Sequence, residues 1–476
     1  YLITLYSSKT LFFILKIIVA RVLGPKDYGF WSLLSLILLY GNFLDFGLTY
    51  ALVKEVPFYR GKGQSREANE IKNTVFTSIL ILSTAVAVIT LTLFPFLRNF
   101  EKNLAAIIYL VVLIFILQQI RDYLFSCFVA DRKFTALSVL IISLMFVSGI
   151  LIIVFILKFG LVGLLLGMAL GYLLVLIPVF IKYKFVTKLQ LDIKRALSLV
   201  KIGFPIMVIA IAYTLFFTID QILIFKYLGR ENLGYYGIVF ALNSILLLFP
   251  ASLGIMVFPR ISERYGVNRK PEELKEFVFI PTIMLAYLMS ALLATIYLFL
   301  PAAVYLIVPK YSLGINAARI SLMGIMFFSV SIFSQKFLIA INQQINCLRI
   351  IFFALVFKIV LICLFINRQM GINGVAMATD IVFFAYSVFI IIFAARHYKN
   401  SYLESVKYLA KIYFPFVYSL MVLSAIVYFK HANILNIKDK LMPIFAIQIF
   451  LVVIPFGYII MKILRAHLDI YRVKRA

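Results

Sequence analysis

The chain has 476 residues, 64% of them hydrophobic, and a formal net charge of +27. A water-soluble globule of this composition would expose far too much apolar surface, so we expect a membrane protein. The positive charge does not indicate a nucleic-acid partner, because the basic residues gather in alternate loops, as the positive-inside rule requires of a membrane protein.

Fourteen apolar runs approach the length of about 20 residues that a helix needs to cross a bilayer. The first six are predicted at residues 2–22, 30–53, 73–95, 104–127, 136–157 and 160–181. Eight more are predicted at residues 202–225, 235–258, 278–300, 316–341, 348–366, 372–395, 408–429 and 441–461. The predicted fold class is therefore an all-α polytopic membrane protein.

A short motif is duplicated in the chain. Residues 22–30 (VLGPKDYGF) reappear 205 residues later as residues 227–235 (YLGRENLGY), each between two long apolar runs. A second pattern matches at an offset of 211 residues and consists of Gly160 with Gly163 and Gly371 with Gly374. Internal duplication in a membrane chain is typical of transporters. We therefore predict two parallel-repeat six-helix lobes around a central cavity, followed by two further helices.

The repeats divide the chain into four predicted parts: an N-terminal lobe (1–187), a cytoplasmic linker (188–201), a C-terminal lobe (202–396) and an extra helix pair with a basic tail (397–476). The linker has the apolar and basic spacing of an amphipathic helix on an anionic leaflet, although a solvated tether also fits. Basic residues are most numerous in the loops on the side of both termini. Both termini are therefore predicted to face the cytoplasm, across the cytoplasmic (inner) membrane.

Glycines predict two local features of the backbone. Gly24 and Gly229 are expected in the left-handed conformation that ends a helix. Gly163, Gly167 and Gly171 recur every four residues and predict a smooth helix face that a neighbouring helix approaches closely.

The sequence offers no set of catalytic or metal-binding residues. The three cysteines have no pairing or metal-ligand spacing, and the three histidines occur singly near the ends of predicted helices. The glutamates lie in or near loops. We therefore expect neither an enzyme nor a bound metal or cofactor, and the lysines of the first predicted helix argue against a cleavable signal peptide.

Ionisable residues inside the predicted helices are the most informative feature. Each costs about 2.5–3.5 kcal/mol at the bilayer centre on insertion scales, so such a side chain normally faces the protein interior or water. The set comprises Lys9, Lys16, Asp45, Arg121, Asp122, Asp220, Lys336, Lys358, Asp380 and Lys411.

Six residues are predicted to bind substrate in the cavity: Lys9, Lys16, Asp45, Asp220, Gln335 and Lys336. Lys9 and Lys16 are two helical turns apart and share one helix face. Gln335 belongs to a polar stripe of the tenth helix made of Gly324, Phe328, Ser331, Gln335 and Asn342, with Lys336 beside it. The stripe fits a sugar-contacting face, and hydrogen bonding between helices is the alternative.

Three carboxylates are candidates for coupling transport to a proton or Na⁺ gradient: Asp45, Asp220 and Asp380. Each lies inside a predicted helix. The alternative for each is a structural ion pair with a lysine of a neighbouring helix.

Residues 20–29 (ARVLGPKDYG), followed by residues 44–48 (LDFGL) and the basic loop from Lys54, resemble the opening of the polysaccharide-export flippases. This family belongs to the multidrug/oligosaccharidyl-lipid/polysaccharide exporter superfamily. The resemblance implies a flippase that moves undecaprenyl-pyrophosphate-linked O-antigen, capsule or exopolysaccharide repeat units to the outer leaflet by alternating access. It also implies a cationic central cavity, for which Lys9, Lys16, Asp45 and Asp220 match by location and type alone.

Simple electrostatics agrees with this resemblance. A diphosphate carries about two negative charges, and a lysine about 4 Å away attracts one of them by roughly 4 kcal/mol at an effective dielectric of 20. We therefore expect Lys9 and Lys16 to hold the diphosphate while the prenyl tail stays in lipid against the last two helices. The expected partners are the polyprenyl-pyrophosphate-linked glycan, membrane lipids, a polysaccharide polymerase and a chain-length regulator.

Other functions remain open from the sequence. A lipid II flippase carries the same prenyl diphosphate, so charge does not separate it from a polysaccharide flippase. A multidrug exporter of the same superfamily is less favoured, because lipophilic cations prefer an acidic cavity. A membrane-bound polymerase or a scaffold is a further alternative, and the absence of a large external loop weighs against the polymerase.

Overall fold

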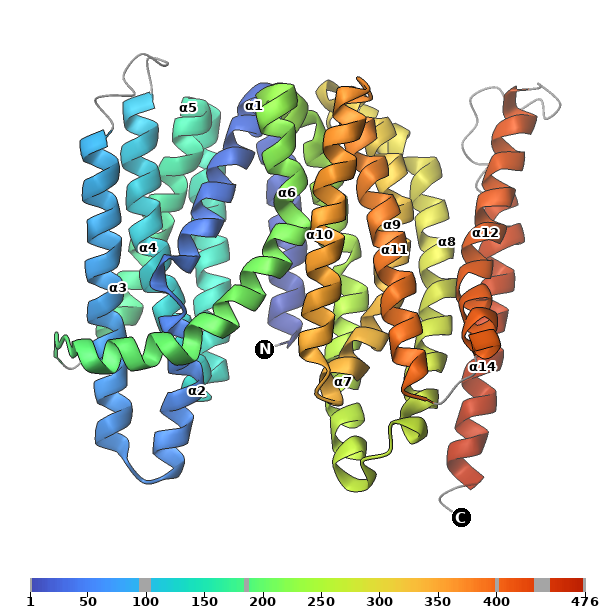
Figure 1. The fold of residues 1–476 in the computed structure, drawn as a ribbon. Helices are drawn as coiled ribbons and strands as arrows, with labels where there is room; N and C mark the ends of the chain where they lie inside the picture. The colour runs from blue at the N-terminus through green and yellow to red at the C-terminus, as the bar shows by residue number, and fades with distance from the viewer. Residues whose placement is uncertain (1, 94–103, 184–187, 399–401, 432–445, 474–476) are drawn as a thin grey trace. The chain divides into compact units, whose positions relative to one another are not determined.

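The computed structural model describes residues 2–93, 104–183, 188–398, 402–431 and 446–473, and they are almost entirely helical. The chain divides into two compact units, Tyr1–Gly234 and Tyr235–Ala476. Figure 1 shows long helices in each unit and no strand among the described residues. The predicted all-α membrane fold is confirmed.

The first unit contains five complete helices and most of a sixth. They are α1 (Leu2–Gly41), α2 (Leu48–Gly61), α3 (Ser65–Leu93), α4 (Leu104–Ala130), α5 (Phe134–Tyr183) and the part of α6 (Ile193–Leu246) up to Gly234. The helices α3, α4 and α5 run side by side (Figure 1). The first turns of α6 contact α3, where Arg195 pairs with Glu67 and Glu70.

The second unit contains the end of α6 from Tyr235 and the other helices of the described residues. These other helices are α7 (Leu248–Asn268), α8 (Lys275–Ile307), α9 (Ile315–Ala340), α10 (Gln344–Asn367), α11 (Gly371–Arg396), α12 (Tyr402–His431) and α14 (Ile454–Val473). Neighbouring helices pack as α8 with α9, α9 with α11, and α10 with α11, while α12 lies beside α8 (Figure 1).

The sequence predicts more membrane crossings than the described structure has continuous helices of crossing length. By length and hydropathy, the described residues contain 10 helices able to cross a bilayer, or up to 11 with the bent pair α1–α2. Three of the long helices, α1, α5 and α6, are each interrupted by a glycine with non-helical backbone angles: Gly24, Gly160 and Gly229. Each interrupted helix corresponds to two of the crossings expected from the sequence.

The glycine interruptions follow the sequence repeat. Gly24 (φ 72, ψ 173) and Gly229 (φ 86, ψ 176) have nearly the same backbone angles. Gly160 and Gly371 form the second matched pair, with φ values of 54 and 55. Gly24 and Gly229 have the positive φ of the expected left-handed helix-ending conformation, but they do not adopt that conformation. Their ψ values differ from those of a helix C-cap and lie in a region that is essentially restricted to glycine.

A third pair of matched positions with positive φ contains no glycine, so the repeated glycines of the sequence do not reveal it. Arg132 (φ 55) and Asn342 (φ 63) lie in the turns that join α4 to α5 and α9 to α10. Asn342 was expected on the tenth helix, but α9 ends at Ala340. Asparagine tolerates the left-handed region better than most residues, which explains why the helix ends there.

The two halves of α5 pack through the predicted glycine face. A Cβ atom added to Gly163, Gly167 or Gly171 would overlap the backbone at Phe155, Ile152 or Ser148, respectively. Along this contact, residue numbers increase from 163 to 171 in the second half of α5 and decrease from 155 to 148 in the first half. The two halves are therefore antiparallel. The predicted close approach is confirmed, and the chain reverses at Gly160.

The linker between the predicted lobes is helical from Ile193, where α6 begins, so the linker residues from there on form the first turns of α6. Its apolar residues face two ways: Leu199 is buried against the core of the first unit, whereas Leu189 and Leu197 are 69% and 58% exposed. This distribution fits the expected amphipathic helix. Its place on a membrane leaflet and the four-part division of the chain stay predictions.

Candidate functional site

Lys16 is a half-buried cation in the first half of α1. Its Nζ atom lies 5.2 Å from the centroid of the Phe12 ring, within the range of a cation–π interaction. No carboxylate of the described residues forms an ion pair with Lys16. Its charge therefore remains available to an anionic ligand. Lys9 lies on the same helix, but its side chain is outside the described part of the structure.

Asp45 is 2% exposed and lies at a break in the second predicted helix. The short 3-10 helix η1 (Asn42–Asp45) follows α1, and Gly47 then takes a φ of 84 before α2 begins. The backbone N–H groups of Gly47 and Thr49 donate to the carboxylate of Asp45, each at 2.9 Å, and the Thr49 hydroxyl donates at 2.6 Å. Asp45 therefore caps the start of α2.

A charged cluster joins α4 to the second half of α5. The Arg121 guanidinium donates to Asp122 Oδ1 at 2.8 Å and to the Tyr172 hydroxyl at 3.0 Å. Asp122 and Tyr50 also interact electrostatically with Asp45. Arg121 and Asp122 therefore pair with each other, and Asp122 lies within electrostatic range of Asp45.

Asp220 is 2% exposed in α6 and lies near a polar contact between α6 and α1. The hydroxyl groups of Tyr40 and Thr218 are 2.5 Å apart, and Tyr40 interacts electrostatically with Asp220. The backbone N–H of Gln221 donates to Asp220 Oδ1 at 3.2 Å. Sequence reasoning missed Tyr40 and Thr218, because spacing along a helix does not reveal a contact between helices 178 residues apart.

The polar stripe of the tenth predicted helix faces α11. Gln335 is 8% exposed and donates from Nε2 to the Tyr386 hydroxyl at 3.1 Å. The rings of Phe328 and Tyr386 stack with their centroids 5.7 Å apart. This geometry fits the alternative of hydrogen bonding between helices, while sugar contact by Gln335 stays a prediction.

Lys336 has a different environment from the neighbouring Gln335. It is half-buried, and its side-chain carbons face Gly254 of α7, where an added Cβ would lie 3.5 Å from Cγ and 3.6 Å from Cε. Its Nζ atom lies 6.0 Å from the centroid of the Phe258 ring. The side chain thus runs along α7.

Asp380 in α11 is buried against two other helices. It is 7% exposed, and a Cβ at Gly324 of α9 would overlap its Oδ1 atom. Neither carboxylate oxygen has a hydrogen-bond partner among the described residues. Lys358 of α10 is fully buried and interacts electrostatically with Asp380, and its Nζ lies 5.5 Å from the Phe383 ring. The buried carboxyl group of Asp380 therefore lies within electrostatic range of the buried Lys358 ammonium group.

A second buried charged group lies in the first unit, and the sequence analysis did not single it out. Lys72 and Asp131 are each 2% exposed as side chains and are 2.7 Å apart, and Arg60 reaches the same carboxylate at 2.9 Å. The helices predicted at residues 30–53 and 73–95 place Arg60 and Lys72 in the basic loop between them. In the structure α2 continues to Gly61 and α3 starts at Ser65, so both cations lie on helices that meet the end of α4.

The described residues hold no group of three or more histidine, cysteine, aspartate or glutamate side chains placed to bind a metal ion. Cys127 and Cys347 are buried and Cys363 is half-buried, all as free thiols.

These features define a class: a multi-pass, all-α membrane protein with an internal repeat and buried charged side chains inside its apolar helices. Residues 1–264, more than half of the chain, match the family described as polysaccharide biosynthesis protein. The chain belongs to this family. Residues 205–364 also match the MatE family.

One relative has a similar sequence over most of its length. It is an uncharacterized membrane protein of Methanocaldococcus jannaschii, 26% identical over 417 residues, which cover 83% of this chain and 95% of the relative.

Solved structures share the fold. An inward-facing multidrug resistance MATE family transporter of the MOP superfamily has a TM-score of 0.66 at 15% identity, over 82% of this chain and 94% of its own. The lipid II flippase MurJ in an inward closed conformation has a TM-score of 0.65 at 15% identity, over 97% of this chain and 98% of its own. A MOP superfamily transporter from Pyrococcus furiosus has a TM-score of 0.54 at 15% identity, over 83% and 96% of the two chains.

Proposed function

We propose that this protein is a flippase that moves a polyprenyl-pyrophosphate-linked oligosaccharide repeat unit across the cytoplasmic membrane by alternating access. Membership of the polysaccharide biosynthesis protein family and the fold shared with MOP superfamily transporters support this proposal. The substrate is the O-antigen, capsule or exopolysaccharide unit that the sequence resemblance implies. The protein acts as a transporter and forms no covalent intermediate.

The observation that carries the proposal is the half-buried Lys16. A cation inside an apolar helix is costly, by about 2.5–3.5 kcal/mol at the bilayer centre. A lysine placed there without a carboxylate partner among the described residues therefore indicates an anionic ligand or a water-filled path. A prenyl diphosphate is such a ligand, because its charge can stay near the lysine while its tail remains in lipid. Lys9, two turns away on α1, is proposed as the second cation.

The test is a leaflet assay in reconstituted vesicles with a defined lipid-linked oligosaccharide. Lys16→Ala is expected to reduce the flipping rate at least about tenfold, because losing one charge contact of a few kcal/mol has an effect of this size. Lys16→Arg retains the charge and is expected to flip substrate.

Lys158→Ala serves as the matched control, because Lys158 is an exposed lysine in the turn of α5. Equal flipping by the Lys16→Ala and Lys158→Ala proteins, both inserted at normal levels, would reject the role of Lys16.

The proposal includes coupling to a proton or Na⁺ gradient through a buried carboxylate. Asp45 is the least suited of the three candidates, because its oxygens accept hydrogen bonds that cap α2. Asp220 lies in a polar contact, and Asp380 has two buried oxygens without hydrogen-bond partners among the described residues. We propose Asp380, with Lys358 nearby, as the main coupling site and Asp220 as the second.

Lipid II is the second candidate substrate. The lipid II flippase structure aligns with 97% of this chain, compared with 82% for the MATE transporter, so its similarity extends further along the sequence. The two substrates share the prenyl diphosphate and differ in the sugars and peptide. Complementation of a strain that lacks its lipid II flippase would favour lipid II, and restoration of surface polysaccharide in a flippase-deficient strain would favour the polysaccharide unit.

A further inference from the structure

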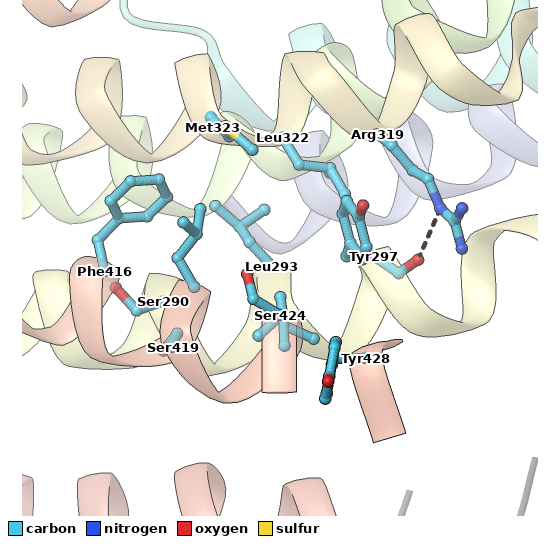
Figure 2. Close-up of a pocket in the computed structure, with 13 residues that line it drawn as sticks. Ser290, Leu293, Tyr297, Arg319, Leu322, Met323, Phe416, Ser419, Ser424 and Tyr428 are labelled. Carbon is cyan, nitrogen blue, oxygen red and sulfur yellow. Dashed lines mark hydrogen bonds between the residues drawn. The ribbon is translucent and has the colours of Figure 1, made fainter. Parts of the chain in front are cut away.

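A pocket of about 480 Å³ lies among α8, α9 and α12, separate from the charged residues described above. Its walls are mainly apolar and include Leu293, Leu322, Met323 and Phe416. Figure 2 shows Phe416, Ser290 and Ser419 toward one end and Arg319 with Tyr297 at the other. The volume falls within the range of about 300–1,000 Å³ that is typical of small-molecule sites.

Arg319 is the one basic residue among the described residues that line this pocket. Its Nε atom donates to the backbone carbonyl of Tyr297 at 3.3 Å, and the guanidinium carbon lies 4.7 Å from the centroid of the Tyr297 ring. No carboxylate of the described chain forms an ion pair with it. The remaining guanidinium nitrogens are therefore available to an anion, and this planar group matches the geometry of a phosphate.

The other end of the pocket is enclosed. Ser290 and Ser419 are 2% and 3% exposed, and the Ser419 hydroxyl has no hydrogen-bond partner among the described residues. At the opposite end, Tyr428 of α12 is 67% exposed. From Phe416 to Tyr428 the helix rises about 18 Å, at 1.5 Å per residue.

This length indicates what fills the pocket. One leaflet contributes about 15 Å of the hydrocarbon core, half of the total of about 30 Å, so an apolar pocket about 18 Å long matches one extended acyl chain. Arginine and tyrosine at one end are typical of the interface between hydrocarbon and headgroups. A single guanidinium balances one negative charge, which is the charge of a phosphodiester headgroup, whereas a diphosphate carries about two.

We infer that this pocket binds an anionic membrane phospholipid, with one acyl chain among α8, α9 and α12 and the phosphate on Arg319. This lipid site is additional to the proposed transport of a prenyl diphosphate. It makes the protein sensitive to the anionic lipid content of its membrane. The site and the transport function can fail independently, because binding and flipping are measured separately.

Native mass spectrometry of the full-length protein tests the inference. The probes are phosphatidylglycerol and phosphatidylcholine with identical acyl chains. The wild type is expected to retain phosphatidylglycerol in preference, and Arg319→Gln is expected to weaken its binding by roughly tenfold while leaving phosphatidylcholine unchanged. Ser419→Phe, which fills the enclosed end, is expected to weaken binding of both lipids.

The matched control is Arg368→Gln, since Arg368 is exposed in the turn between α10 and α11 and carries the same charge. Unchanged binding in this variant supports the assignment to Arg319. Equal phosphatidylglycerol binding by wild type and Arg319→Gln overturns it. Stoichiometric displacement of phosphatidylglycerol by undecaprenyl diphosphate also overturns it, because the pocket would then belong to the transport substrate.

Discussion

Gly29 and Gly234 occupy equivalent places in the two copies of the duplicated motif, and each contacts the backbone of the other copy. A Cβ on Gly29 would overlap the carbonyl oxygen of Arg230, and a Cβ on Gly234 would overlap the carbonyl oxygen of Pro25. Pro25 and Arg230 are themselves equivalent positions of the repeat. The contact is therefore reciprocal, as in an isologous interface, and it explains why both copies keep glycine at this position.

The contact predicts that Gly29→Ala and Gly234→Ala each destabilise the protein. The added methyl group forces backbone atoms apart, and overpacking of this kind costs about 1–3 kcal/mol. Thermal unfolding in detergent, followed by loss of the monodisperse species, measures the effect. Gly61→Ala is the control, because a Cβ there meets nothing within 4 Å. If all three variants unfold at one temperature, the backbone contact has no energetic role.

Asp45→Ala is expected to destabilise the start of α2, because three hydrogen bonds to the carboxylate are lost. Loss of a capping side chain costs about 0.5–2 kcal/mol, and Asp45→Asn, which keeps an acceptor oxygen, is expected to cost less. Stability measurements on both variants check this order. A stable Asp45→Asn protein that flips substrate but no longer responds to an ion gradient would instead assign Asp45 to coupling.

Lys72→Ala is expected to be strongly destabilising, by about 3–5 kcal/mol, because it removes one partner of a buried charged pair and leaves Asp131 with Arg60 alone. Lys54→Ala, at an exposed lysine of α2, is the matched control. Expression level and unfolding temperature are the measurements. A Lys72→Ala protein as stable as the control would show that Arg60 alone compensates the Asp131 charge.

Asp380→Asn is expected to remove the gradient dependence of flipping while leaving the protein folded, because asparagine preserves the shape beside Gly324. Flipping rates with and without imposed proton and Na⁺ gradients measure the coupling. The exposed Asp27 supplies the control, as Asp27→Asn. Retention of normal gradient dependence in the Asp380→Asn protein would move the coupling site elsewhere, with Asp220 the next candidate.

The sequence predicts most of the fold because its main signals are local. Apolar runs of crossing length identify the helices, and the repeated glycines identify the turns, since Gly24 and Gly229 adopt backbone angles that other residues rarely adopt. The break at Gly47 was not predicted, because the apolar pattern continues through it. The break is evident only in the structure, where the Asp45 carboxylate accepts hydrogen bonds from the backbone N–H groups of Gly47 and Thr49.

The candidate site is harder to predict because its partners are distant in sequence. Lys72 and Asp131 are 59 residues apart, and Gln335 and Tyr386 are 51 apart, so no helical spacing joins them. An intramembrane charge indicates that some partner or ligand exists. Its identity depends on which helices pack together, as α3 does with α4 and α9 with α11.

The central claim is that Lys16 recognises the diphosphate of a lipid-linked glycan. The most direct measurement compares initial flipping rates of one oligosaccharide carried on a prenyl diphosphate and on a prenyl monophosphate, in vesicles containing wild-type or Lys16→Ala protein. The wild type should prefer the diphosphate, and Lys16→Ala should lose most of that preference by slowing the diphosphate substrate alone. Equal rates for the two carriers in the wild type, or an unchanged preference in Lys16→Ala, would contradict the claim.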